Sequence, residues 1–434
     1  MLKVVDVCTR VEGHGNVKIF LQNDEINFVD FEISAFRGFE KILIGKKLID
    51  APRIVSRICG LCHASQMITS CKTIEDLYDY KVSEQTSLLR RLIMTGELIK
   101  SHSMHFFFQS FPDLLQIFDE TKSILDPYEL IKFDPQLTTY LYDLIKFGNE
   151  IDNIFGGRSV HTINPIVGGV IYNPHRKHLL TAKKYFQKAL ENLEYVIDKF
   201  INLFALKTPP PEFNLPDPYF LGLHNYGKYD RHQGLLRIKE TGNKPFDFQA
   251  QNYKRYFDTD LETRGITFNL NSDKNVLVGP IARRKLIESY EVEDITAYFK
   301  VFNNKWKNSI LFANFLKLIE MYVESKQALE ILESPILTKR ENLESLQHLN
   351  SNEGYGIVEA PRGTLLHYYK VNEQKVIEDI RLIIATEINI PLINYMITEH
   401  AKVLYDKTGD LNMIKKALQK IIRAFDPCIA CATH

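Results

Sequence analysis

Two short stretches at opposite ends of the chain, Arg57-Ile-Cys-Gly-Leu-Cys62 and Asp426-Pro-Cys-Ile-Ala-Cys431, carry the strongest signal in the sequence. Each contains a Cys-x-x-Cys pair, whose two intervening residues form a turn that can aim both sulfurs at one metal. A site built from both pairs would have four sulfur ligands and would tie the beginning of the chain to its end. A closed, structural four-cysteine zinc site in a non-enzymatic scaffold also fits this spacing, so spacing alone leaves the function open.

Composition places the chain among ordinary globular proteins. It has 434 residues, with 45% apolar and 25% charged residues, and its 54 Lys and Arg residues balance 54 Asp and Glu residues. Without a basic excess, nucleic acid is a poor candidate partner. No apolar run approaches the length of a membrane span, and the start lacks the features of a secretory signal, so we expect a cytoplasmic protein. Of its six cysteines, Cys8 and Cys71 lie outside the pairs and are expected in the core.

Helical periodicity dominates the chain between two small β regions. Alternating apolar residues predict a hairpin of residues 17–21 and 28–33. The segment 209–275, rich in Pro, Gly, Tyr and Asn, is expected to be irregular and partly extended. We expect a mainly α fold with small β regions (α+β), in which residues 1–434 form one interlocked domain around a central bundle of long helices, with the termini meeting at the metal site. The remaining predicted strands are 356–359, 365–371 and 377–384, and the predicted helices are 83–112, 137–155, 178–204, 292–332 and 411–424.

The surroundings of the cysteine pairs narrow the choice of metal. They closely resemble the two signatures of nickel-iron hydrogenase large subunits, and within that family the cytoplasmic multimeric branch. The resemblance recurs in order along the whole chain. It is carried by RVEGHG (10–15), FRGFEK (36–41), APRIVSRICGLC (51–62), SHSMHFFF (101–108), GGRSVH (156–161), EAPRGTLLHYY (359–369) and DPCIACATH (426–434).

The resemblance implies a role for each of the four cysteines. Cys59 and Cys428 are similar to terminal nickel ligands, whereas Cys62 and Cys431 are similar to the ligands that bridge nickel and iron. The iron of such proteins carries cyanide and carbonyl ligands. Thiolates are soft, strongly donating ligands that suit redox-active nickel, whereas zinc has no redox chemistry. The implied activity is reversible heterolytic cleavage of dihydrogen.

Other residues of these motifs acquire roles from the same resemblance. Glu12 looks like the carboxylate that relays a proton away from a terminal cysteine, and heterolytic cleavage needs such a base. Arg362 is similar to an arginine over the open metal position, where it bonds a cyanide ligand. Asp426 would pair with this arginine, although an ordinary buried salt bridge remains an alternative. Pro361 and Thr386 are expected to line the cofactor beside Arg362.

A second metal site is implied at the C-terminal tail. Glu40 and His434 look like ligands of a magnesium (or iron) ion, and the backbone carbonyl of Leu382 would be the third protein ligand. A hard cation that retains several waters fits so few ligands.

Electrons must leave through another chain, because no further cysteine set exists here for an iron-sulfur cluster. The resemblance therefore implies an iron-sulfur small subunit, docked across a wide apolar surface. NAD(P) or ferredoxin is the expected acceptor, with deazaflavin-reducing and heterodisulfide-reductase-linked types as alternatives. The chain has no Gly-x-Gly-x-x-Gly fingerprint, so any NAD or flavin should bind a partner. A relative of the quinone-site subunit of respiratory complex I is disfavoured by the intact cysteine pairs.

Several polar residues are expected to be structural, or depart from the family pattern. His102 and His105 lie on an apolar helical face and are expected to be core histidines with satisfied hydrogen bonds. His161 is expected to orient its neighbours. Gln66 stands where many relatives have histidine, and Thr162 follows His161 where proline is more usual.

Overall fold

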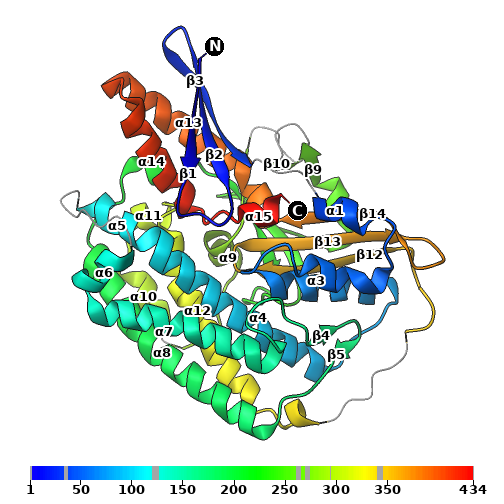
Figure 1. Cartoon of the computed structure of the whole chain (residues 1–434). Helices are drawn as coiled ribbons and strands as arrows, with labels where there is room; N and C mark the ends of the chain where they lie inside the picture. Colours follow the sequence, from blue (N-terminus) through cyan, green and yellow to red (C-terminus); the bar gives the residue numbers. More distant parts are fainter. Residues whose placement is uncertain are drawn as a thin grey trace.

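The computed structural model describes residues 2–33, 38–119, 127–260, 265–268, 274–293, 295–339 and 346–433. A bundle of long helices forms one side of the molecule, and small sheets surround its other side (Figure 1). The fold is therefore mainly α with small β regions, as the sequence predicts. None of the helices in these ranges is both long and apolar enough to cross a membrane.

Two of the four bundle helices, α4 and α7, begin at polar caps. Ser83 Oγ accepts a hydrogen bond of 3.1 Å from the Thr86 amide, and Asp134 Oδ1 accepts one of 2.9 Å from the Leu137 amide. The last of the four bundle helices, α12 (Phe312–Leu332), is buried on nearly all sides, which fits a central position. The bundle consists of α4 (Glu84–Met104), α7 (Pro135–Ile151), α8 (Arg176–Phe204) and α12 (Phe312–Leu332).

The prediction that the first long helix ends near Pro112 is wrong. Helix α4 passes through a π-helical turn, His105–Ser110, directly into α5 (Phe111–Phe118). Proline is tolerated here because it lies in the first turn of α5, where a missing N–H costs little. The predicted helix 292–332 is also wrong as one element, because it is divided into α10 (Ile295–Lys300), α11 (Asn304–Lys307) and α12.

A three-stranded antiparallel sheet opens the chain and confirms the predicted hairpin, with one further strand before it. Its strands are β1 (Leu2–Cys8), β2 (Gly15–Gln22) and β3 (Glu25–Ile33). The edge of β3 lies against α13, where the Val29 and Phe31 amides donate to Thr398 Oγ1 and Asn394 Oδ1. The two C-terminal helices beside this sheet are α13 (Ala385–Thr408) and α14 (Leu411–Ala424).

A second antiparallel sheet supports the helix that follows the first cysteine pair. Its strands are β12 (Glu353–Ala360), β13 (Gly363–Val371) and β14 (Ile377–Ile384). The sequence predicted the first two at shorter lengths and the third with its observed bounds. Helix α3 (His63–Leu77) packs on β12 so closely that a Cβ on Gly354 or Gly356 would lie 2.4 or 2.3 Å from α3 backbone oxygens. Glycine at these two positions therefore fixes the height of α3 over the sheet.

The segment 209–275 is more regular than predicted. It supplies most of a four-stranded sheet in the order β11-β6-β7-β8, whose short strands gave little periodicity. These strands are β6 (Tyr219–His224), β7 (Leu235–Lys239), β8 (Phe246–Phe248) and β11 (Val276–Leu277). The remaining named elements are α1 (Gly38–Leu43), α2 (Ala51–Val55), α6 (Pro127–Phe133), α9 (Pro280–Leu286), α15 (Ile429–Ala432), β4 (Pro165–Ile166), β5 (Gly169–Val170), β9 (Phe257–Asp260) and β10 (Gly265–Phe268).

A buried ionic network joins the sheets to the bundle. Arg283 of α9 donates to Glu320 of α12 over 2.6 and 2.7 Å and to Glu359 of β12 over 2.9 Å. All three side chains are at most 1% exposed. Each charge therefore depends on the others for compensation.

Arg283→Ala should lower the free energy of unfolding by about 3–5 kcal/mol, because it leaves two buried carboxylates without their cation. Urea unfolding followed by circular dichroism measures the change. Arg381→Ala is the control, since Arg381 is 47% exposed and lies 3.7 Å from Asp379. Its expected effect is below about 0.5 kcal/mol. Equal effects of the two variants would contradict the role of the network.

Candidate metal centre

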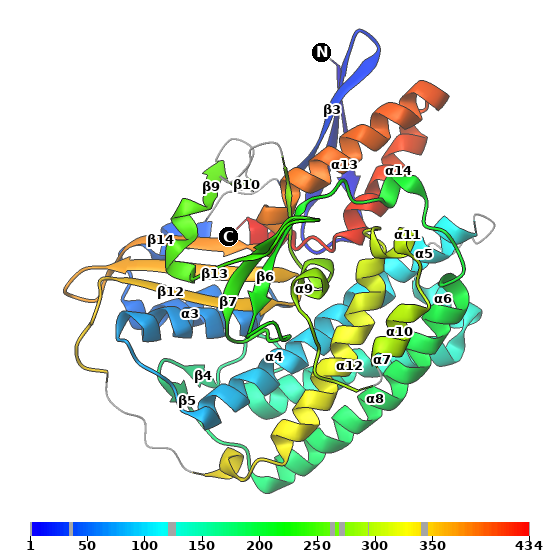
Figure 2. The same cartoon turned by 180° about the vertical axis from the view of Figure 1, so that it is seen from behind.

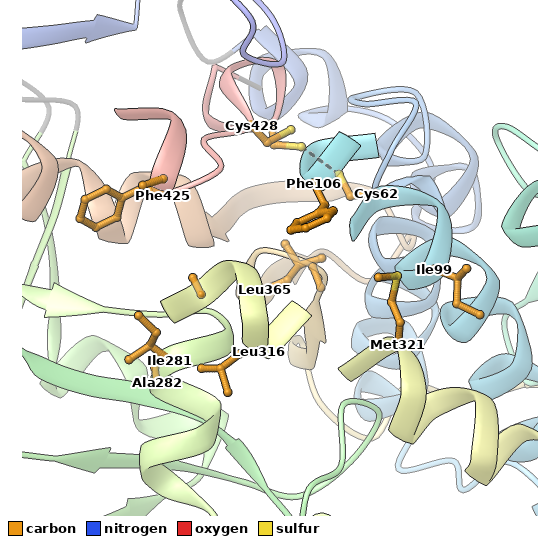
Figure 3. Packing of buried hydrophobic residues seen from close by; sticks show 14 of the residues in the cluster. Cys62, Ile99, Phe106, Ile281, Ala282, Leu316, Met321, Leu365, Phe425 and Cys428 are labelled. Atoms are coloured by element: carbon orange, nitrogen blue, oxygen red, sulfur yellow. Dashed lines mark hydrogen bonds between the residues drawn. The ribbon is translucent and has the colours of Figure 1, made fainter. Parts of the chain in front are cut away.

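The four cysteines of the two pairs meet in one buried cluster. Cys59 and Cys62 lie in the turn before α3, and Cys428 and Cys431 lie at the start of and within α15. Their sulfurs all lie within 4.8 Å of one another, and each residue is at most 5% exposed. Cys62 Sγ is 2.8 Å from Cys431 Sγ, and Cys59 Sγ is 3.4 Å from Cys428 Sγ. Figure 3 shows Cys62 and Cys428 projecting toward each other above an apolar layer.

Backbone contacts hold the C-terminal pair against the N-terminal segment. Glu12 and Cys428 form an isolated parallel bridge, in which the Ile429 amide donates to Glu12 O over 2.9 Å. The Cys428 amide donates to Thr386 Oγ1 over 2.9 Å. The segment that meets the C-terminal tail thus lies just after β1, while the first residues of the chain run outward along this strand (Figure 1).

The donor set fits a soft metal. Burial raises the pKa of Cys428 and Cys431 well above the ordinary value, so these thiols would hold their protons without a cation. Hydrogen bonds from the other cysteines hold the pKa of Cys59 well below its usual range. Four buried thiolates need positive charge, and soft metals such as nickel, iron and zinc supply it.

A carboxylate lies beside two of the four sulfurs. The Cys428 thiol donates to Glu12 Oε2 over 3.0 Å, and Cys59 Sγ lies 3.7 Å from Glu12 Oε1. The Ala430 amide also donates to Oε2, over 3.1 Å. Burial and the neighbouring Cys59 raise the pKa of Glu12, although the Cys428 hydrogen bond opposes the shift. Glu12 can therefore exchange a proton with the cluster nearer to neutral pH than an exposed glutamate could.

An arginine-aspartate pair lies next to the cysteines. Arg362 Nε donates to Asp426 O and Oδ1 over 3.0 and 3.1 Å, and its Nη1 donates to Ser101 Oγ over 3.3 Å. Arg362 Nη2 lies 3.0 Å from Asp426 Oδ1, but its N–H groups do not point toward this oxygen. Among the described residues Nη2 therefore has no hydrogen-bond acceptor. One buried N–H group is thus left for a bound group.

Sequence reasoning missed Lys317, which completes this pair. Its Nζ donates to Asp426 Oδ2 over 2.6 Å and lies 2.7 Å from His105 Nδ1. Burial lowers the pKa of Lys317 to about 8. Although burial alone would raise the pKa of Asp426, the adjacent Arg362, His105 and Lys317 hold it well below the usual range. A lysine inside the apolar run Phe315-Leu-Lys-Leu-Ile319 was the signal that could have found it.

Both predicted core histidines are buried, but only His105 has hydrogen-bond partners at both ring nitrogens among the described residues. His105 Nε2 lies 2.8 Å from Arg423 O, so both of its ring nitrogens are satisfied. His102 Nε2 lies 2.9 Å from Glu320 Oε2, whereas its Nδ1 has no partner within the described part of the chain. His161 Nδ1 lies 2.7 Å from Ser56 O, which anchors its loop beside the first cysteine pair.

The two departures from the family pattern have local partners. Gln66 Oε1 lies 2.8 Å from His367 Nε2, and a hydrogen-bonded chain continues through Tyr369 to Ser70. Thr162 donates its amide to His63 Nδ1 over 3.3 Å. His63 follows Cys62 directly, so the departure at Thr162 acts on the surroundings of this cysteine.

The predicted second metal site is only partly within the described residues. Glu40 is buried, and its Oε1 accepts a hydrogen bond of 2.9 Å from the Leu382 amide. These two residues are therefore adjacent across α1 and β14, while His434 lies outside the described residues. Pro361 O accepts a bond of 3.0 Å from Arg283, which orients the loop that carries Arg362.

Comparison with known proteins identifies the class. The sequence model described as nickel-dependent hydrogenase matches residues 37–140 and 273–434. The chain is 29% identical to one subunit of the F420-non-reducing hydrogenase vhc of Methanococcus voltae, over 99% of this chain and 94% of that protein. It is 28% identical to the beta subunit of the NAD-reducing hydrogenase HoxS of Cupriavidus necator, with the same coverage. A solved NAD+-reducing NiFe hydrogenase in the H2-reduced state superposes with a TM-score of 0.92 at 25% identity, over the whole of both chains.

The fold and the four-sulfur cluster thus define a redox metalloenzyme rather than a zinc scaffold. The chain belongs to the nickel-dependent hydrogenase family. It is an oxidoreductase with the catalytic function of a nickel-iron hydrogenase large subunit.

Proposed function

We propose that Cys59, Cys62, Cys428 and Cys431 hold a nickel-iron pair at which dihydrogen is cleaved heterolytically or formed. The main support is the cluster of four sulfurs, which all lie within 4.8 Å of one another. Glu12 accepts a hydrogen bond from one of them, Cys428 Sγ. When bound, the metal pair would supply the redox-active centre that takes up the two electrons of dihydrogen.

We assign Cys59 and Cys428 as terminal nickel ligands and Cys62 and Cys431 as bridges to iron. Two observations support this division. The closest sulfur contact, 2.8 Å, joins the two proposed bridging residues, one from each pair. Glu12 contacts both proposed terminal residues, at 3.0 Å from Cys428 Sγ and 3.7 Å from Cys59 Sγ.

The surrounding side chains then move protons and hold charge. Glu12 accepts a proton from the Cys428 sulfur, with which it already shares a hydrogen bond. Asp426 fixes Arg362, and the unsatisfied Nη2 of Arg362 is available to a cyanide ligand of iron or to a polarised substrate. Pro361 and Thr386 complete the lining of the cofactor. Thr386 also holds the Cys428 backbone, since its Oγ1 accepts a hydrogen bond from the Cys428 amide. Lys317 keeps Asp426 ionised as a positioning residue.

Further components of the proposal lie beyond this centre. Iron carries cyanide and carbonyl ligands, and Glu40, the Leu382 carbonyl and His434 bind magnesium (or iron) that secures the tail. The chain functions as one interlocked domain in the cytoplasm, with an iron-sulfur small subunit. We favour NAD(P) or ferredoxin as the acceptor, reached through flavin-carrying partners. A heterodisulfide-reductase-linked or deazaflavin-linked complex is the second candidate, although the name of the F420-non-reducing relative gives no support to the deazaflavin-linked type.

Metal quantification tests the proposed centre directly. The purified complex should contain about one nickel per copy of this chain, with iron beyond the amount that the partner's clusters account for. Elemental analysis by mass spectrometry gives both numbers, and infrared spectra would report cyanide and carbonyl bands. Zinc as the sole metal of this chain would overturn the proposal, and the zinc scaffold would replace it.

A further inference from the structure

A pocket of about 350 Å³ lies between β7, α9, α11 and α12, and it is lined by four cations. Lys239 ends β7, Arg284 and Lys285 lie on α9, and Lys307 ends α11. Figure 2 shows α9 between β7 and α12. All three elements contribute lining residues. We call these four residues with their apolar floor the basic pocket.

The charges of the basic pocket are not paired at close range. No carboxylate lines it, and none of its four cations forms an ion pair with a described residue. Their polar contacts are neutral: Lys239 Nζ donates to Lys285 O over 3.3 Å, and Lys285 Nζ donates to the Asn308 side chain over 3.5 Å. Burial, and then the neighbouring Lys239 and Arg284, lower the pKa of Lys285, although Asp217, beyond ion-pair distance, opposes the shift. This crowding of like charge costs free energy until an anion enters.

Helix ends explain only part of this arrangement. Arg284, Lys285 and Lys307 lie in last turns, where the negative end of the helix dipole favours cations. That effect acts on each helix separately. It gives no reason for cations from a strand and two helices to converge on one hollow, and Lys239 does not belong to a helix.

Aromatic contacts hold two of the cations in place, and an apolar floor lies beneath them. Arg284 lies 4.9 Å from the ring centre of Phe299, and Lys285 lies 5.7 Å from that of Phe220. The floor includes Phe299, Phe312 and Leu316, which are buried but line the pocket. Preorganised cations above an apolar surface are typical of a small-molecule site. The pocket volume of about 350 Å³ lies near the lower end of the range for such sites, roughly 300–1,000 Å³.

We propose that the basic pocket binds a phosphorylated small molecule that carries at least two phosphate-equivalent charges and an apolar moiety, the chemistry of a nucleoside diphosphate. Arginine can bind phosphate oxygens in pairs, and the three lysines supply point charges around it. The apolar moiety would contact the floor. A wider cavity of about 1040 Å³ beside α8 is a weaker candidate, because its Lys183 is already paired with Glu333 at 2.5 Å.

The basic pocket is separate from the metal centre but shares α9 with it. Ile281 lines both the basic pocket and a narrow space that Arg362 and Asp426 also line. Binding can therefore be measured without metal, and its failure would leave the proposed hydrogenase centre untouched.

Calorimetric titration of the purified complex tests the proposal. The probes are ADP, pyrophosphate, inorganic phosphate and an oligoglutamate peptide. We expect one ADP to bind per chain, and we expect this binding to be lost in the Arg284→Gln/Lys307→Gln double variant. The affinity should decrease in the order ADP, pyrophosphate, phosphate. Each single variant should raise the Kd for ADP about tenfold, as for the loss of one charge-assisted contact.

Matched variants separate this site from others in the complex. Lys183→Gln removes one positive charge at the wider cavity and should leave ADP binding unchanged. Circular dichroism spectra and thermal midpoints show whether the variants remain folded. Because partners can bind nucleotides, the criterion is the ADP equivalent that disappears in the double variant. Unchanged ADP stoichiometry in that variant overturns the proposal, as does equal binding of ADP and pyrophosphate. Binding of the peptide alone would make the pocket a docking site for an acidic protein segment instead.

Discussion

Cys428→Ser should abolish hydrogen-dependent dye reduction, with activity below about one hundredth of the wild type. Cys428 Sγ lies within 4.8 Å of the other three sulfurs and 3.0 Å from Glu12. A serine hydroxyl is a hard, poorly acidic ligand, so the variant loses both a thiolate donor to nickel and the sulfur that exchanges a proton with Glu12. The measurements are dye reduction under dihydrogen and the nickel content of the purified protein.

The control is the same chemical change at a cysteine outside the cluster. Cys71 is fully buried on α3, and burial raises its pKa to about 12, so it remains a protonated thiol. Serine at this position can donate to the carbonyl one turn earlier in the helix. Cys71→Ser should therefore retain activity and nickel. If Cys428→Ser kept the nickel and more than a tenth of the activity, the assignment of Cys428 as a terminal ligand would be wrong.

Glu12→Gln should lower dihydrogen oxidation by about 10²- to 10⁴-fold, the usual contribution of a positioned base, and leave the metal content unchanged. The amide keeps the size of the side chain and can still accept the Ala430 hydrogen bond, but it cannot take a proton from Cys428. Exchange between deuterium gas and water protons, measured by mass spectrometry, should fall in parallel with dye reduction.

Glu25→Gln provides the corresponding control at an exposed position of β3. It should retain both dye reduction and isotope exchange. Wild-type exchange in Glu12→Gln would show that the proton leaves by another group. Loss of nickel from this variant would instead mean that the carboxylate stabilises the cluster, so the metal measurement separates the two roles.

The sequence predicted the fold most accurately where the pattern was local and strong. The hairpin around residues 22–24, the helices near residues 178–204 and 411–424, and the strands near residues 365–371 and 377–384 all have clear periodicity. It failed around Pro112, where a π-helical turn lets the chain continue as helix. The strands between residues 209 and 275 were missed because most are short, and the longest, β6, is buried at every residue and so shows no alternation.

The sequence by itself determined the kind of chemistry: two Cys-x-x-Cys pairs, in contexts that resemble one enzyme family, specify a soft-metal redox centre. Only the tertiary structure decided which side chains act together. Glu12 reaches Cys428, Lys317 reaches Asp426, and four cations converge on one pocket because sheets and helices distant in sequence pack against each other. Ligand types and helical periods are properties of neighbouring residues and can be read along the chain. Long-range contacts depend on how buried surfaces fit together, which no local pattern encodes.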